Sequence, residues 1–192
     1  MLKLLVDGLV VSEIQQNRRS GQHQQGHYKL GRVAKSFKTC TFRSGTKVAT
    51  NLWRAVHTDQ YPDGPIKDEE PLPGVLYPTF ERTQIGTLPS GKPKYRDPDI
   101  QITDGKVPRG AGTSLYDKEN FFRGKSWRYL RIPKDTDIDP NLVVTGPVWN
   151  EYIGANHYQI EAIKPMFPEV YRGALDNFAR AAVKKAYEDA RR

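Results

Sequence analysis

The sequence predicts an α+β fold, in which a split or sandwiched β-sheet is closed by one C-terminal helix. From residue 113 onward, short β-rich stretches recur at a spacing of roughly 8–12 residues, which favours such a sheet over alternating strand–helix units. Helical periodicity follows in residues 168–192. The chain has 192 residues, of which 37% are hydrophobic and 27% charged, so we expect one folded domain with its own core.

Positive charge is concentrated in the first quarter of the chain. Residues 1–50 contain nine basic and two acidic residues, a net charge of +7, whereas the whole chain carries +8. A basic leader of this kind fits a solvated tail, an arm that binds nucleic acid or a membrane surface, or an organelle transit peptide. We therefore expect a basic N-terminal extension over residues 1–45, partly disordered or used for targeting, and a folded domain over residues 46–192.

Cysteine usage and hydropathy exclude several classes of protein. Cys40 is the only cysteine, so an intrachain disulfide and a cysteine-based zinc site are both excluded. No apolar run approaches the ~20 residues that span a bilayer, and we expect neither a transmembrane segment nor a secretory signal peptide. His23 and His27 are four residues apart, but neighbouring glycines argue against a helix there, so no metal site is expected.

Strands are expected on both sides of a turn-rich region. The first two cover residues 38–44 (KTCTFRS) and 51–58 (NLWRAVHT), and the second is the stronger candidate. Residues 61–100 contain eight prolines, which exclude a long element, and the best local strand candidate is 76–86 (LYPTFERTQIG). The later strands are expected at 113–117, 127–133, 141–146 and 156–163.

The last element reads as an amphipathic helix that packs on the sheet. Its apolar stripe steps by four, three and four residues through Tyr171, Leu175, Phe178 and Ala182. Pro168 suits the first helical turn. Asp176 lies four residues before Arg180, a spacing that favours an ion pair between them.

Four features are candidates for chemistry: Arg54, the pair Thr113–Ser114, Tyr116, and the dipeptide His157–Tyr158 with Glu161 three residues on. Arg54 interrupts an apolar run, where a guanidinium is unfavourable unless it reaches water, an acid or a bound anion. Each feature also has a structural interpretation: an ion pair for Arg54, a turn or cap for the hydroxyl pair, and core packing for the histidine and the aromatic rings. Metalloprotease, P-loop, nucleophile-elbow and GxGxxG motifs are absent from the sequence.

These residue types suit cleavage of the bond between nicotinamide and ribose in NAD. That reaction passes through an oxocarbenium-like transition state, so a site needs mainly to clamp the dinucleotide and to place polar groups near the developing positive charge. An arginine holds pyrophosphate or ribose, aromatic rings enclose nicotinamide, and an acid or another acceptor aims the nucleophile.

Four stretches of the chain, in order, resemble a known family: GTSLYD, IPKDTDIDPNLVV, NHYQIEAIKPM and GALDNFARAAVKKAYEDARR. They are similar to the Tse-type effector toxins of bacterial type VI secretion, whose fold is similar to that of the ADP-ribosyltransferases. LWRAV looks like the first core strand of that group. The resemblance covers residues 50–192, about three quarters of the chain, and implies an ADP-ribosyltransferase-like split β-sheet sandwich with a C-terminal helix.

The resemblance also implies roles for individual residues. Arg54 fits the first-strand arginine of the Arg–Ser–Glu transferases, and Thr113 and Ser114 fit their second, strand-edge motif. The third strand normally supplies a glutamate, and this sequence departs there, because the nearest acid to His157 is Glu161. On a straight strand residues 157, 159 and 161 share one face. The implied cofactor-binding residues are Arg54, Thr113, Ser114, Tyr116 and Tyr158, and the implied catalytic ones are Ser114, Thr113, His157 and Glu161.

The function implied is that of a cytotoxic domain that binds NAD and transfers ADP-ribose to, or cleaves NAD near, an intracellular target. A neutralising immunity or antitoxin protein is the expected partner, and the cytoplasm is the expected site of action, with mitochondrial targeting by the leader as an open alternative. Two other functions stay open. One is a non-catalytic basic module that binds nucleic acid through the leader, and the other is a degenerate transferase fold without turnover.

Overall fold

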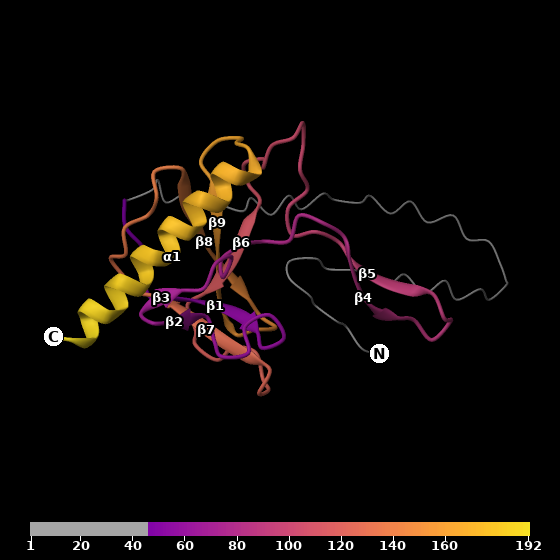
Figure 1. Ribbon diagram of the computed structural model, residues 1–192, viewed down its shortest axis with the longest axis horizontal. Coiled ribbons are helices and arrows are strands. Elements are labelled where there is room, and N and C mark those ends of the chain that lie inside the picture. The colour runs from indigo at the N-terminus through magenta and orange to yellow at the C-terminus, as the bar shows by residue number, and fades with distance from the viewer. Residues whose placement is uncertain (1–45) are drawn as a thin grey trace, which may run out of the picture. The chain divides into compact units, whose positions relative to one another are not determined.

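The computed structural model describes residues 46–192, so the basic extension and the strand expected at 38–44 lie outside the described residues. Within residues 46–192 the chain runs through nine strands and then one long helix. Figure 1 shows the helix lying along the main sheet. The strands are β1 Leu52–His57, β2 Ile66–Lys67, β3 Glu70–Pro71, β4 Thr83–Thr87, β5 Pro93–Arg96, β6 Gly112–Tyr116, β7 Trp127–Ile132, β8 Leu142–Asn150 and β9 Ala155–Ala162, and the helix is α1 Pro168–Ala190.

Five of these strands form one antiparallel sheet in the order β7-β1-β6-β9-β8. The α+β class expected from the sequence is therefore confirmed, and so are strands in the regions 51–58, 113–117, 127–133, 141–146 and 156–163. Within residues 46–192, no helix combines the length and the apolar character that crossing a bilayer requires.

Helix α1 covers one face of the sheet, which we call the helix face. This face is defined by Leu52, Val56, Leu115 and Ile160, each at most 5% exposed. The predicted helix stripe packs onto it, because Tyr171, Leu175, Phe178 and Ala182 are all fully buried. The Tyr171 hydroxyl also donates to the main-chain oxygen of Ile160 over 2.8 Å, which ties the helix to β9.

The ion pair expected within α1 is not formed. The carboxylate of Asp176 instead accepts a hydrogen bond from the Tyr77 hydroxyl over 2.6 Å. Arg180 donates to the side-chain oxygen of Asn177. The reason is burial: the loop before β4 lies against this part of the helix and offers a phenol donor, whereas Arg180 is exposed.

The opposite face of the sheet carries a second, aromatic cluster, and we call it the aromatic face. Its buried members are Tyr116, Phe121, Ile153 and Ala155, with Trp53, Ala55, Phe122 and Tyr129 packed around them. The phenol of Tyr129 accepts from the amide of Phe122 and donates to the carbonyl of the same residue, which anchors the loop between β6 and β7. The five-stranded sheet is therefore covered on both faces near its centre.

The turn-rich region forms two small ribbons, β2–β3 and β4–β5, separate from the main sheet. The strand expected over residues 76–86 is wrong in its first half, because only Thr83–Thr87 is extended in a sheet. Residues 74–77 form a turn in which the amide of Tyr77 bonds to the carbonyl of Gly74. That turn buries Val75 and Leu76 in the core, so their apolar character reflects packing and not a strand.

Candidate functional site

Strand β6 places its two adjacent hydroxyls on opposite faces of the sheet. The register pairs Thr113 with Ile160 and Ser114 with Gln159. Because side chains alternate along a strand, Thr113 points to the helix face and Ser114 to the aromatic face. The two hydroxyls of the pair therefore lie on different faces of the sheet.

Thr113 has a structural role in the core. Its side chain is 1% exposed, and its hydroxyl donates over 2.6 Å to the main-chain oxygen of Leu76. This contact closes the loop over residues 74–77 onto β6, since a buried carbonyl needs a donor. Thr113 is therefore a structural tie in this fold.

Ser114, Gln159 and Thr145 form a row of polar side chains across β6, β9 and β8. Ser114 is registered with Gln159, and Gln159 with Thr145. Residues paired across antiparallel strands share a face and lie about 4.5–5.5 Å apart at Cβ. All three side chains are half-buried, so the row is partly accessible on the aromatic face.

Glu161 lies in the next row. It is registered with Gly112 and Val143, and it is 8% exposed. The hydroxyl of Thr145 donates a short hydrogen bond to Oε1 of Glu161. The carboxylate thus has a fixed orientation on the same face as Ser114. The expectation that residues 157 and 161 share one face is confirmed by the register.

His157 and Tyr116 form the row on the other side of Ser114. They are registered with each other, and their rings lie 5.2 Å apart between centroids at 52°. Tyr116 is 7% exposed, and its ring also packs at 4.4 Å from that of Phe121. His157 is half-buried. The imidazole therefore borders the polar row, and Tyr116 forms the wall behind it.

Arg54 approaches this row from the other side of the sheet. It alternates with Trp53 and Ala55 of the aromatic cluster, so its side chain leaves β1 on the helix face. Nη1 donates over 3.3 Å to the main-chain oxygen of Ser114. Strands β1 and β6 share a single registered pair, Trp53 with Tyr116. The guanidinium thus occupies the place where the two strands separate.

The guanidinium of Arg54 is incompletely satisfied. Its Nε is buried and has no hydrogen-bond partner in the described part of the chain. Two phenols, those of Tyr61 and Tyr171, lie within electrostatic reach. Burial raises the pKa of Tyr61, and the positive charge of Arg54 partly opposes that shift. Burial likewise raises the pKa of Tyr171. Neutral phenols do not neutralise the guanidinium, and it forms no ion pair within residues 46–192, so this position can accept an anion.

Tyr158 lies apart from the polar row. Its registered neighbour on β6, Leu115, belongs to the helix face. It helps to line a largely apolar cavity of about 350 Å³, whose other walls include Val48, Leu52, Ile138, Val144 and Pro147. Burial is the main cause that raises the pKa of its phenol, with Asp117 adding to the shift. The structure therefore does not bring Tyr158 together with Ser114 and His157.

Two residues of the polar row, Gln159 and Thr145, were not singled out from the sequence. The alternation of side chains along a strand could have identified Gln159, because it lies between His157 and Glu161 on the same face. Thr145 carried no such signal: it lies 16 residues from Glu161, and only the pairing of β8 with β9 brings their side chains together. No group of three His, Cys, Asp or Glu side chains in residues 46–192 is arranged to hold a metal ion.

Two glycines let the strands of the site approach each other. A Cβ at Gly112 would lie 1.9 Å from the main-chain oxygen of Ile160. A Cβ at Gly146, whose φ is +121°, would lie 2.8 Å from the main-chain oxygen of His157. Any larger residue would push β6 or β8 away from β9, and with it the side chains of the polar row.

Comparison with known proteins agrees with this architecture. A family model described as the Tse2 ADP-ribosyltransferase toxin matches residues 32–187, and so begins before the described residues. The chain is also 34% identical, over 156 residues, to a protein named Toxin Tse2 from Pseudomonas aeruginosa. That alignment covers 76% of this chain and 95% of the relative. The fold is thus an ADP-ribosyltransferase-like α+β fold, and the chain belongs to the Tse2 ADP-ribosyltransferase toxin family.

Proposed function

We propose that this toxic ADP-ribosyltransferase-like domain binds NAD across the place where β1 and β6 separate, which Arg54 reaches from the helix face and Ser114 from the aromatic face. There it breaks the nicotinamide–ribose bond and passes ADP-ribose to an intracellular target or to water. One observation carries the proposal. Ser114, His157 and Glu161 lie on one face of two adjacent strands, and the guanidinium of Arg54 bonds to the main chain of Ser114. The polar and aromatic groups on one face and the guanidinium on the other thus border the same place, where β1 and β6 separate.

The residues present fit NAD. The orphaned Nε of Arg54 is the kind of donor that a pyrophosphate or ribose oxygen would satisfy. The row of Ser114, Gln159 and Thr145 offers hydroxyl and amide groups for ribose and carboxamide. NAD supplies the bond to be broken and the nicotinamide leaving group.

The roles of the side chains follow from their surroundings. Glu161, oriented by Thr145, would stabilise positive charge that develops on the ribose, and would aim the incoming nucleophile. Ser114 would hold the ribose or the carboxamide of nicotinamide. His157, backed by Tyr116, would border the ring that leaves. Thr113 would act only by holding β6 in place.

The test is release of nicotinamide from NAD by the purified full chain, with binding of NAD measured in parallel. We expect Ser114→Ala and Glu161→Gln to reduce turnover by at least about 100-fold. Ser90→Ala and Glu188→Gln remove the same groups from exposed positions and should leave turnover unchanged. Full activity in both site variants would refute the assignment. Binding of NAD without turnover in the unmodified chain would instead support a degenerate transferase.

Two consequences for partners follow from the proposal. A domain that consumes NAD or modifies an intracellular target acts inside the recipient cell, so its site of action is the cytoplasm. A cell that makes such a toxin needs a neutralising protein, and we expect one that covers the place where β1 and β6 separate. Arrest of growth on expression of the chain, relieved by Ser114→Ala at an unchanged protein level, checks the first consequence.

A further inference from the structure

The ribbon β4–β5 is a second exposed element that the proposed function does not use. All five residues of β4 are exposed. The turn between the two strands runs from Leu88 to Lys92 and is closed by a hydrogen bond from the amide of Leu88 to the carbonyl oxygen of Lys92. Three large apolar side chains stand in solvent: Ile85 is 46% exposed, Leu88 42% and Tyr95 45%. A two-stranded ribbon with no covered face is only marginally stable in water. The ribbon therefore lacks a covering surface among the described elements.

The two edges of the ribbon differ. Strand β5 begins with Pro93 and carries Lys94 and Arg96, and such residues are the usual protection of an edge strand. Strand β4 reads TQIGT, with neither proline nor charge. Its register with β5 shifts between Gln84 and Gly86, so Ile85 is the extra residue of a bulge. The outer edge of β4 is thus short and uncharged, and no strand within residues 46–192 pairs with it.

Charge on the ribbon has one sign. Residues 82–96 contain Arg82, Lys92, Lys94 and Arg96 and no acidic residue. Arg82 and Arg96 are neutralised at the base of the ribbon, by Asp97 at 3.3 Å and Asp99 at 2.8 Å. Neither lysine has an ion pair in the described part of the chain. Positive charge therefore lies beside an open, uncharged strand edge.

Because of this pattern, we propose that the β4–β5 ribbon is a docking site for an extended, acidic segment of a partner protein, which adds as a third strand along β4. Main-chain hydrogen bonds would supply part of the affinity, and Ile85, Leu88 and Tyr95 would be covered by apolar side chains of the partner. Lys92 and Lys94 would select acidic partners.

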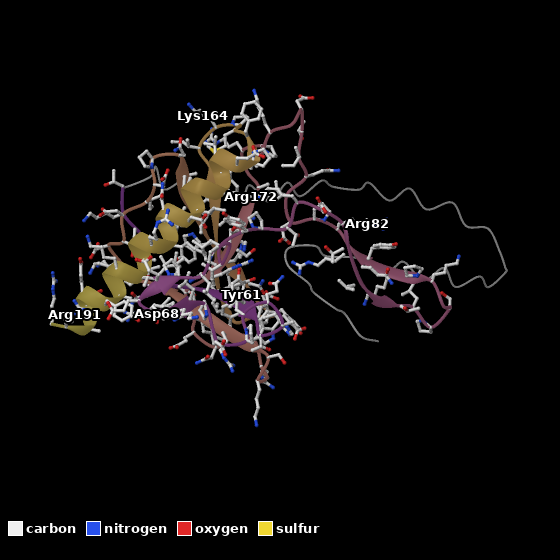
Figure 2. The ribbon with its side chains drawn as sticks, viewed as in Figure 1. Tyr61, Asp68, Arg82, Lys164, Arg172 and Arg191 are labelled. Carbon is white, nitrogen blue, oxygen red and sulfur yellow. The ribbon has the colours of Figure 1, made fainter. Side chains whose placement is uncertain are left out.

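Other occupants fit the ribbon less well. A second copy of this chain would bring two basic ribbons together, which like charge opposes. The chain's own first 50 residues carry a net charge of +7 and are disfavoured for the same reason. Nucleic acid would use the aromatic ring of Tyr95 for base stacking. That ring is already covered by the guanidinium of Arg82, which lies 4.6 Å from its centroid. Figure 2 labels Arg82 near the base of the ribbon.

The experiment uses the full chain and three probes: a capped peptide of alternating glutamate and valine, its lysine–valine counterpart, and a short DNA duplex. We expect the acidic peptide alone to bind at the ribbon, and hydrogen exchange to slow at the amides of Thr83–Thr87. Lys92→Glu with Lys94→Glu should weaken that binding by about tenfold or more and raise affinity for the lysine peptide. Lys134→Glu with Lys184→Glu, at exposed positions elsewhere, is the matched control.

Three results would overturn the proposal: no binding of the acidic peptide, binding that both double variants weaken equally, or protection of the β4 amides by the duplex. Concentration-dependent self-association that protects the same amides would assign the ribbon to a second copy and would also overturn it. None of these results depends on turnover of NAD, so this proposal and the proposed function fail independently.

Discussion

Arg54 on β1 donates a hydrogen bond through Nη1 to the main-chain oxygen of Ser114 on β6, over 3.3 Å. The two strands share one registered pair, Trp53 with Tyr116. Beyond that pair the contact between β1 and β6 is made by the guanidinium of Arg54 and not by main-chain hydrogen bonds of a regular ladder. The contact joins the two sequence features that resembled the first and second motifs of the transferases, although their side chains leave the sheet on different faces.

Replacing Arg54 by methionine should separate a functional role from a structural one. The guanidinium has a buried, unpartnered Nε, and no described carboxylate forms an ion pair with it. Its removal should therefore leave the melting temperature unchanged or raise it, because burying charge without a partner is unfavourable. Affinity for NAD should fall by about tenfold or more.

Calorimetric melting and titration with NAD measure these two effects. Arg128→Met, at an exposed position in β7, is the control. A large fall in melting temperature for Arg54→Met, with affinity for NAD retained, would show that the residue is a structural partner.

The two hydroxyls of β6 should respond differently to single substitutions. Thr113→Ala removes the donor to the buried carbonyl of Leu76, so we expect a loss of about 1–3 kcal/mol in the free energy of unfolding. The Ser114 hydroxyl has no comparable buried partner, so Ser114→Ala should lower the free energy of unfolding by less than about 0.5 kcal/mol. The same substitution should abolish toxicity.

Urea unfolding and growth arrest of expressing cells give the two readouts for these variants. Thr113→Ser keeps the donor and should recover most of the stability. Equal destabilisation by both alanine variants would contradict the assignment of the two side chains to opposite faces.

Gly112 and Gly173 should respond oppositely to alanine. At Gly112 a Cβ would meet the main-chain oxygen of Ile160 at 1.9 Å, so Gly112→Ala should destabilise the domain by about 3 kcal/mol or more and disturb the polar row. At Gly173, inside α1, nothing lies within 4 Å of the added atom. Gly173→Ala should stabilise by about 1 kcal/mol, because alanine is the better helix former. Urea denaturation curves of the two variants test the contrast directly.

The contact between Tyr77 and Asp176 predicts a loss of stability at alkaline pH. Burial, followed by the hydrogen bond to the Asp176 carboxylate, raises the pKa of Tyr77 from 10.0 to about 12. A pKa that is raised on folding stabilises the protein fully below the unfolded value, and this contribution disappears as the pH rises through the folded value. The contact should therefore stabilise the fold below pH 10.0 and be lost by about pH 12.

Tyr77→Phe tests this pH dependence. We expect it to lower the free energy of unfolding by about 1–2 kcal/mol at neutral pH, and the difference from the unmodified chain to shrink through the alkaline range. Tyr152→Phe, at a side chain that is 66% exposed, is the control. A difference that stays constant with pH would show that the phenol does not titrate as proposed.

Local structure was predictable where side-chain periodicity is strong. The stripe on α1 and the strands around residues 52–57 and 155–162 follow from patterns of neighbouring residues, and the structure confirms them. The strand expected at 76–86 was wrong in its first half. Val75 and Leu76 lie in a turn, and they are apolar because that turn buries them in the core. The Asp176–Arg180 pair was wrong because a phenol from a distant loop competes for the same carboxylate.

The sequence by itself determined the α+β class, the long closing helix, the basic leader and the family resemblance, because all of these depend on local order and composition. It also indicated that residues 157, 159 and 161 share a face. Only the tertiary structure decided that Thr113 and Ser114 have separate roles, that Thr145 orients Glu161, and that Arg54 meets Ser114 where two strands part. These contacts join residues 16 to 60 positions apart, or depend on which strands pair, and pairing is a property of the whole packed sheet.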